Sequence, residues 1–143
     1  MKTIRQFLLI YILSLFSVLA YSQESESMTI NNMSTNQVFD NLKIFALEND
    51  YFIQKMDRKE GFLQFYYYSK RKGIFTRDHI LTINLFVIPQ AENKNRLSLQ
   101  IKAAEVFTDD FKPYYEDIGI LPEGKPYTDL LSLITQFFDR IEG

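Results

Sequence analysis

Residues 80–88, with the sequence Ile-Leu-Thr-Ile-Asn-Leu-Phe-Val-Ile, decide the fold class. Every second residue of this stretch, beginning with its second, is aliphatic, which is the period of a β-strand with one buried face. Pro89 has no N–H group for a strand ladder, so the sequence predicts that the strand stops there. A polar turn over residues 91–95 follows, and residues 97–103 repeat the alternation. The pattern predicts two antiparallel strands, the first of them central, each with one buried and one solvated face.

Two shorter strands are expected before the central one. Residues 51–56 and 62–68 are rich in aromatic and aliphatic side chains, which favour strands. The five residues between them are mostly charged and end in Gly61, which suits the loop of a β-hairpin. A basic loop, residues 69–77, then leads into the central strand.

A helix is predicted over residues 35–48. Ser34 is a favourable N-cap, and Gln37 three residues later completes a capping box. Met33 stands where it could form a hydrophobic staple with the fourth helical residue. The apolar residues recur at helical spacing and are expected in the core: Val38, Phe39, Leu42, Phe45 and Ala46.

A second helix closes the chain. It is expected to begin near Pro126 or Thr128, and it carries a wide apolar stripe made of Leu130, Leu131, Ile134, Phe137, Phe138 and Ile141. Residues 107–125, which precede it, show no sustained period and contain two prolines and two glycines, so they are predicted to form a long irregular connection. Because this connection is rich in aromatic and aliphatic residues, we expect it to pack over a sheet edge or the mouth of a cavity.

These elements predict a single α+β domain over residues 34–143, preceded by a flexible leader, residues 23–33. The expected architecture is a two-layer sandwich in the order helix, four-stranded antiparallel meander and C-terminal helix, with both helices on one face of the sheet. The other face then needs an explanation, because its side chains are more apolar than contact with solvent requires.

Residues 1–22 have the three parts of a secretory signal peptide: Lys2 and Arg5, an apolar run over 7–20, and small residues before a cleavage site after Ser22. A 14-residue apolar helix is about 21 Å long, whereas a membrane span must cross about 30 Å. The sequence therefore predicts an exported, periplasmic or secreted protein that would touch the membrane only through an uncleaved signal segment. With no cysteine in the chain, a lipid anchor at the cleavage site is excluded.

Charge and composition argue against several functions. Residues 23–143 carry 14 basic and 18 acidic side chains, and this acidic balance does not favour nucleic acid. The single histidine, His79, is expected at a loop or strand edge without chemistry, because its neighbour Asp78 would point to the opposite face. The acidic pairs Asp109/Asp110 and Glu116/Asp117 lack the spacing of a calcium loop. The sequence shows no motif of a known catalytic or cofactor site, so we expect a protein that is not an enzyme and has no cofactor.

Candidate binding residues come from the second hairpin strand and from the aromatic connection. The run over residues 65–68, followed by basic residues 70–72, would suit contact with a protein, a glycan or anionic lipid head groups. The predicted partner or ligand surface consists of Phe62, Tyr66, Tyr68, Phe111, Tyr114 and Tyr115. The first hypothesis is an exported, non-enzymatic envelope domain that binds a protein partner. The alternative is a carrier that holds an amphipathic or lipid-like ligand between the sheet and the C-terminal helix, with the connection as its lid.

Residues 34–61 also resemble a known pattern. A capped helix containing Phe39 is followed by Asn-Asp-Tyr-Phe-Ile at 49–53, which enters a strand, and then by Asp57-Arg58 and Gly61 before the next strand. This is similar to the helix-grip domains of outer-membrane assembly lipoproteins of the BamC type, and to exported domains of unknown function with a TATA-binding-protein-like arrangement. The resemblance implies a two-layer fold and the envelope of a Gram-negative bacterium, with no catalytic residues. This chain departs from the BamC type in having one domain and no lipid-acceptor cysteine.

Overall fold

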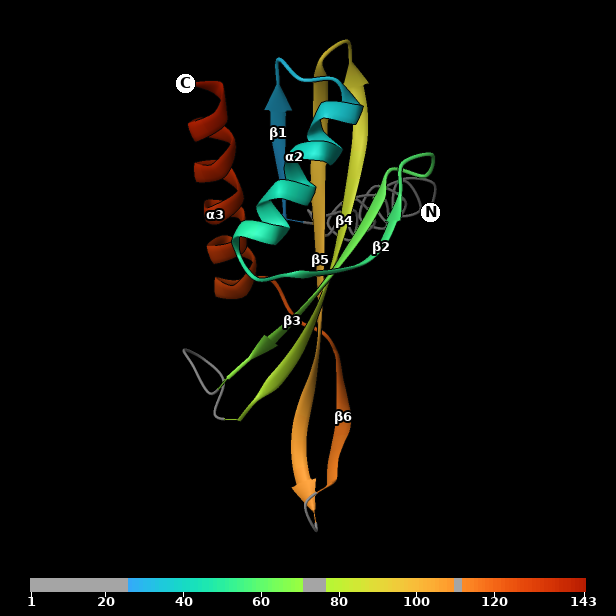
Figure 1. The fold of residues 1–143 in the computed structure, drawn as a ribbon, viewed down its shortest axis with the longest axis vertical. Coiled ribbons are helices and arrows are strands. Elements are labelled where there is room, and N and C mark those ends of the chain that lie inside the picture. The colour runs from blue at the N-terminus through green and yellow to red at the C-terminus, as the bar shows by residue number, and fades with distance from the viewer. Residues whose placement is uncertain (1–25, 71–76, 110–111) are drawn as a thin grey trace, which may run out of the picture.

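The protein is an α+β structure with one antiparallel sheet and two helices. The computed structural model describes residues 26–70, 77–109 and 112–143. Within these residues the elements are β1 (Ser27–Asn31), α2 (Thr35–Glu48), β2 (Phe52–Asp57), β3 (Phe62–Ser69), β4 (His79–Ala91), β5 (Lys94–Asp109), β6 (Lys112–Ile120) and α3 (Lys125–Glu142). The strand order is β1-β5-β4-β3-β2, and β6 pairs with the far end of β5 (Figure 1). Buried residues of both helices share one core with the strands, so both helices cover the same face. The signal peptide expected over residues 1–22 lies outside the described residues.

The described sheet has six strands, where the sequence analysis expected four. The first additional strand, β1, lies in the stretch that was expected to be a flexible leader, so the chain order begins with a strand and not with a helix. It pairs antiparallel with β5, from Ser27 opposite Ser98 to Asn31 opposite Lys94. Only Ile30 of this strand is buried. One buried residue in five produces no period, which is why the sequence pattern did not reveal it.

The second additional strand, β6, lies in the middle of the predicted irregular connection, and β5 extends into its beginning. It pairs with β5 from Lys112 opposite Asp109 to Ile120 opposite Lys102, with a register shift near Gly119. Nearly all of its residues are exposed. A strand that buries neither face has no reason to alternate apolar and polar residues, so its sequence lacked the expected pattern. Pro113 and Gly119, which are common in turns, also favoured the prediction of a loop.

The central strand continues past Pro89, contrary to the expectation, and ends at Ala91. The N–H of Val87 donates to the carbonyl oxygen of Gly61 at 2.8 Å, so it points to the β3 side of β4. Because successive N–H groups of a strand alternate in direction, the nitrogen of Pro89, two residues later, points to the same side. The pairing with β3 ends at Phe86, opposite Phe62. The proline nitrogen therefore faces the side on which β4 has no further strand partner, and its missing hydrogen removes no ladder bond.

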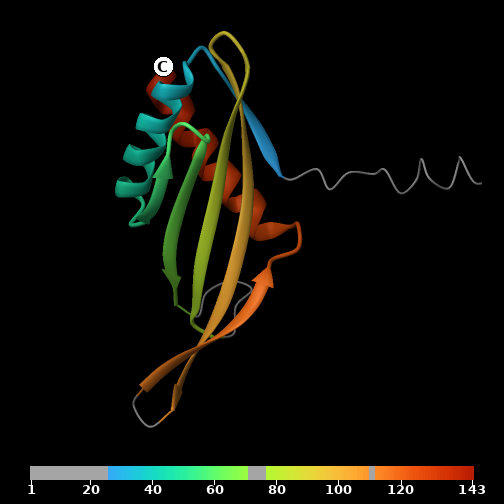
Figure 2. The same ribbon diagram turned by 90° about the vertical axis from the view of Figure 1, so that its right-hand side faces the viewer.

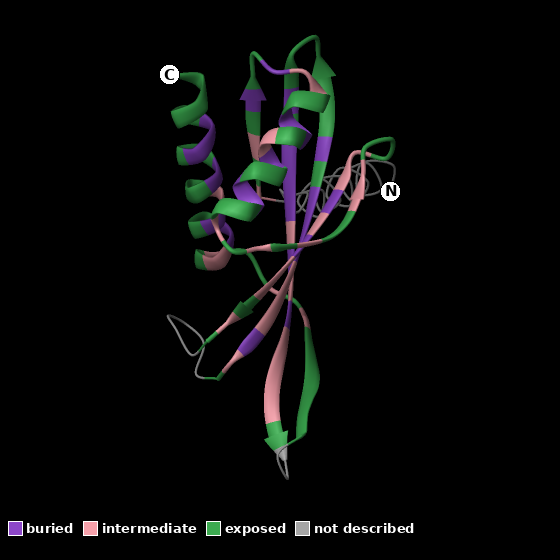
Figure 3. Ribbon diagram, in the orientation of Figure 1, coloured by how far each residue is buried: buried purple, intermediate pink, exposed green. Residues whose placement is uncertain are grey.

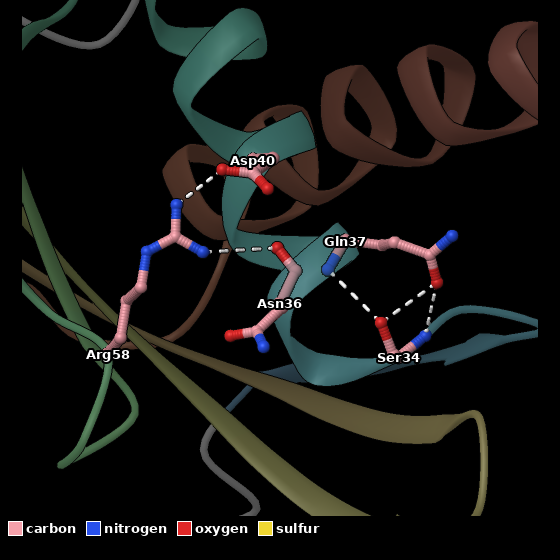
Figure 4. Close-up of polar contacts among 5 residues, drawn as sticks. All are labelled: Ser34, Asn36, Gln37, Asp40 and Arg58. Atoms are coloured by element: carbon pink, nitrogen blue, oxygen red, sulfur yellow. Dashed lines mark hydrogen bonds and ion pairs between the residues drawn. The ribbon is translucent and has the colours of Figure 1, made fainter.

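Helix α2 has the bounds and the cap that the sequence predicted. The backbone N–H of Gln37 donates to Oγ of Ser34 at 3.4 Å, and the Ser34 N–H donates to Oε1 of Gln37 at 2.8 Å (Figure 4). Arg58, from the loop between β2 and β3, forms an ion pair with Asp40 and donates to the carbonyl oxygen of Asn36 at 3.4 Å. These contacts fix the start of α2 and connect it to the hairpin loop.

The core lies between the two helices and one face of β1, β3, β4 and β5 (Figure 3). The apolar positions expected in α2 and in residues 97–103 are buried, as are most of those in α3, although Ile141 in its last turn is exposed. The far ends of β5 and β6 extend beyond both helices (Figures 1 and 2). We call this projecting part, residues 104–109 and 112–117, the arm. The sheet consequently has one face that the helices cover and a second face that neither of the two described helices covers.

Candidate binding surface

The register of the strands defines which residues share the uncovered face of the sheet, which we call the open face. Three cross-strand rows run over it at successive two-residue steps: Phe62–Phe86–Ser98, Gln64–Asn84–Gln100 and Tyr66–Thr82–Lys102. The residues between these rows, such as Leu63, Phe65 and Ile83, point to the covered face and are buried. The alternation expected from the sequence is therefore present in the structure.

Large apolar side chains are exposed on the open face. Phe52 of β2, which pairs with Tyr66, is 74% exposed, and Tyr115 of β6, which pairs with Val106, is 58% exposed. Other exposed residues of this face, placed by the same register, are Tyr68, Phe86, Ile88 and Ile120. Groups of exposed apolar residues on one face are uncommon at protein surfaces, whereas single scattered ones are ordinary.

The middle row of the open face is a ladder of three side-chain amides, which we call the amide ladder. Nε2 of Gln64 donates to Oδ1 of Asn84 at 2.7 Å, and Nδ2 of Asn84 donates to Oε1 of Gln100 at 3.0 Å. Asn84 is buried between its two neighbours, while Gln64 and Gln100 are half-buried. The ladder therefore forms a continuous uncharged polar strip across β3, β4 and β5.

Aromatic side chains border the amide ladder on both sides. On one side the rings of Phe62 and Phe86 lie 5.2 Å apart, and Nζ of Lys55 sits 5.4 Å from the centre of the Phe62 ring. On the other side lies Tyr66, next to Phe52. Burial raises the pKa of the Tyr66 phenol, and the Tyr115 phenol raises it further, which brings β6 into the electrostatic surroundings of this row.

Four of the six residues that the sequence analysis selected share the open face. Phe62, Tyr66 and Tyr68 lie on the open face of β3, where Gln64 separates the first two, and Tyr115 extends the surface onto β6. The hydroxyl of Tyr68 donates to Oδ2 of Asp78 at 2.7 Å, which orients its ring.

The other two selected residues do not belong with them. Tyr114 lies on the opposite face of β6, where its ring stacks on Phe107 with 5.0 Å between centres, and the Arg77 guanidinium lies 4.6 Å from the Phe107 ring. Adjacent residues of a strand face opposite ways, so Tyr114 and Tyr115 could not share one surface. Phe111 lies outside the described residues.

Sequence reasoning did not select Phe52 or the amide ladder. Phe52 belongs to the first hairpin strand, where a register slip of one residue exchanges the two faces and leaves its side undetermined. The ladder residues are ordinary polar positions when each strand is considered alone. Only the pairing of Gln64 with Asn84 and of Asn84 with Gln100 brings them into one row.

His79 lies at the end of a strand, within the expected placement at a loop or strand edge, but it is buried there. It is the first residue of β4 and only 3% exposed. Its Nδ1 lies 2.7 Å from the carbonyl oxygen of Arg77, and its Nε2 lies 3.5 Å from Oε1 of Glu105. Glu116 and Asp117 lie opposite Glu105 and Ala104, on different faces of β6, so they do not form a carboxylate pair. Within the described ranges, the structure contains no cluster of three residues that could hold a metal ion.

The space between α3 and the sheet is filled by side chains. Leu130, Ile134 and Phe138 are buried there in the common core. The Tyr127 hydroxyl accepts a hydrogen bond from the Ile101 N–H at 3.0 Å and donates to the Leu121 carbonyl at 3.1 Å, which fixes α3 to β5. The pocket between α2 and α3 lies at the surface and is lined by Glu48, Asn49, Leu133, Gln136, Phe137 and Arg140.

No family model matches the sequence, and no curated protein shows significant similarity to it. The similarity to helix-grip envelope domains therefore stays a prediction. Neither helix in the described part of the chain is long and apolar enough to span a membrane.

Proposed function

We propose that this protein is an exported, non-enzymatic domain of the periplasm or cell envelope that binds a protein partner through the open face. The observation that carries the proposal is the group of exposed aromatic side chains on that face, with Phe52 and Tyr115 the most exposed. A sheet covered by helices on one side ordinarily presents polar residues on the other. Tyrosine and phenylalanine are instead the residue types that contribute most area at protein interfaces.

The chemistry of the open face also supports binding over catalysis. Its groups are mainly aromatic rings and side-chain amides, and its charged residues include Lys102, whose Nζ forms an ion pair with Oδ2 of Asp117 at 3.8 Å. Amides and phenyl rings do not serve as general bases or nucleophiles, whereas they do provide hydrogen bonds and apolar contact. The open face is therefore equipped for recognition.

The carrier hypothesis lacks a comparable observation. A carrier needs an enclosed apolar space, and the buried residues of α3 occupy the space where the ligand was expected. We therefore retain protein binding as the single proposed function. Export is proposed from the three-part pattern of residues 1–22 alone.

Site-specific cross-linking tests the proposed function. A photo-reactive phenylalanine analogue is placed at Phe52 on the open face or, as a control, at Leu47 of α2, which is 65% exposed. In the native host we expect one discrete cross-linked protein from position 52 and none from position 47. Tyr66→Asp should abolish the cross-link while the circular dichroism spectrum stays unchanged, because a charge on this face opposes burial of its aromatic surface.

Two results would contradict the proposal. Equal cross-linking from both positions would show that the open face has no special role. A cross-link that survives Tyr66→Asp would place the contact elsewhere on the molecule. The mass of the protein recovered from the host tests export separately, since cleavage after Ser22 leaves a chain that begins at Gln23.

A further inference from the structure

The amide ladder has unused hydrogen-bonding groups at its two ends. Each internal bond runs in the same direction, from Gln64 to Asn84 and from Asn84 to Gln100. Among the described residues this leaves Oε1 of Gln64 without a donor and Nε2 of Gln100 without an acceptor. The strip therefore offers one acceptor over β3 and one donor over β5, with no formal charge between them.

The dimensions of the strip suit one extended chain. Neighbouring strands lie about 4.8 Å apart, so the ladder spans about 10 Å from β3 to β5, which is the length of about three extended residues. The aromatic positions that border it on β3, Phe62 and Tyr66, are four residues apart, or about 13 Å along the strand. An extended chain lying on the amides would therefore have aromatic contacts on both sides.

The chemistry of the ladder favours a polypeptide backbone as its occupant. Each peptide unit supplies one N–H donor and one C=O acceptor and carries no charge, which complements the two ends of the ladder. An anionic ligand would be held best by a cation beside the strip. Lys102, one row from the ladder on β5, already has a carboxylate partner, because its Nζ lies 3.8 Å from Oδ2 of Asp117.

Strand addition at the free edge of β6 is a weaker candidate for the same partner. Pro113 has no N–H to offer a new strand, and charged residues such as Lys112 and Glu116 are exposed along β6. Proline and charge are the features by which edge strands avoid pairing. The open face, which is built from side-chain amides, has no such obstacle.

We propose that the open face recognises an extended, uncharged segment of its partner, which lies across β3, β4 and β5 on the amide ladder between the aromatic borders. The proposal rests on the proposed function and specifies what is bound. Gln64 and Gln100 hydrogen-bond to the backbone of the segment, and Phe62, Phe86 and Tyr66 contact its side chains.

A peptide selection tests this inference. A phage library of random, unstructured dodecapeptides is selected on the immobilised protein, and the enriched peptides are measured against three variants. Gln100→Leu removes the donor, Gln64→Leu removes the acceptor, and Gln136→Leu on α3 is the matched control. We expect about tenfold weaker binding to the first two variants and unchanged binding to the control. The side-chain amide resonances of Gln64 and Gln100 should shift when peptide is added.

The outcomes separate this inference from the proposed function. Failure to enrich any peptide, or equal binding to the wild type and to both ladder variants, overturns the inference. The proposed function survives that result if the cross-link from position 52 is still observed. If chitohexaose shifts the ladder amides and the peptides do not, the open face is a glycan site and both proposals are wrong. Circular dichroism of each variant confirms that it is folded, and Gln64→Leu keeps the inference testable if Gln100→Leu does not fold.

Discussion

The two faces of strand β3 both carry large apolar side chains, but these side chains have very different surroundings. On the covered face, Leu63 and Phe65 are fully buried beneath the helices, whereas Phe62, Tyr66 and Tyr68 on the open face remain partly or largely accessible. Folding accounts for the first set, because burial of apolar surface is its main driving force. It does not account for the second. The difference teaches that hydrophobicity on this strand has two causes, packing on one face and, as proposed, recognition on the other.

The largest expected effect comes from Phe65→Ala on the covered face. The Phe65 ring lies 5.8 Å from that of Tyr51 and 6.5 Å from that of Phe45, and its loss would leave a cavity in the aromatic part of the core. We expect the free energy of unfolding to fall by about 3–5 kcal/mol. The control is Phe86→Ala on the open face, which should cost less than about 1.5 kcal/mol because the ring is already partly in water. Equal losses in urea denaturation would show that the two faces do not differ as proposed.

A smaller effect is expected from replacing either of two glycines, Gly61 just before β3 and Gly119 in β6. Gly61 has a φ of +67°, and an added Cβ would lie 2.5 Å from the Val87 carbonyl oxygen. Gly61→Ala should therefore destabilise by about 2 kcal/mol or more, since backbone strain and a clash add together. Gly119 has a φ of +88° with no atom near the added Cβ, so Gly119→Ala should cost about 1 kcal/mol. Thermal unfolding of both variants tests this order, and the reverse order would contradict it.

Alkaline pH is expected to weaken the covered face. Burial raises the pKa of Tyr51 to about 12, and the Tyr67 phenol adds to the shift. The unfolded chain releases this proton near its ordinary pKa of 10.0, but the folded protein holds it, so stability falls as pH rises from 10 to 12. Because the phenol is partly exposed, we expect a loss of about 1–2 kcal/mol. In urea denaturation across this range Tyr51→Phe should flatten the dependence, and an unchanged slope would contradict the assignment to Tyr51.

The smallest effect is expected from Arg58→Ala. This side chain joins the hairpin loop to α2 through Asp40 and lies 5.7 Å from the Phe39 ring, but both charged groups are exposed. Exposed ion pairs contribute little, so the loss should be about 0.5 kcal/mol and should shrink in high salt. A loss above about 2 kcal/mol would show that the contact with Phe39 matters more than the ion pair.

The sequence predicted those parts of the fold in which burial leaves a period. Helix α2, the hairpin of β2 and β3, and the buried side of β5 follow from apolar spacing and from the cap at Ser34. Strands β1 and β6 were not predicted, because they are held by backbone pairing with β5 while burying little or nothing of their own. The expected end of β4 at Pro89 was wrong. A missing N–H removes a ladder hydrogen bond only where a neighbouring strand faces it, and the sequence does not show where β3 ends.

The candidate surface was predictable only in part, for a related reason. Aromatic composition identified Phe62, Tyr66 and Tyr68, but it could not distinguish Tyr115 from Tyr114 without the pairing of β6. The amide ladder depends on three strands in register, so it exists only in the folded protein. The sequence predicted the features that depend on the burial of apolar residues, and it did not predict those that depend on how the strands pair.

The position of β1 also has a consequence for how the chain reaches its native state. Asn31 pairs with Lys94 and Ser27 with Ser98, so every rung of this ladder closes a loop of more than sixty residues. The other pairings of the described sheet join strands that follow one another in the sequence, so the β1–β5 pairing loses the most chain entropy when it forms. The first strand cannot pair until β5 has been synthesised. A chain proposed for export would thus lack this pairing while its N-terminus is already engaged in secretion, and the sheet would be completed at β5 only afterwards.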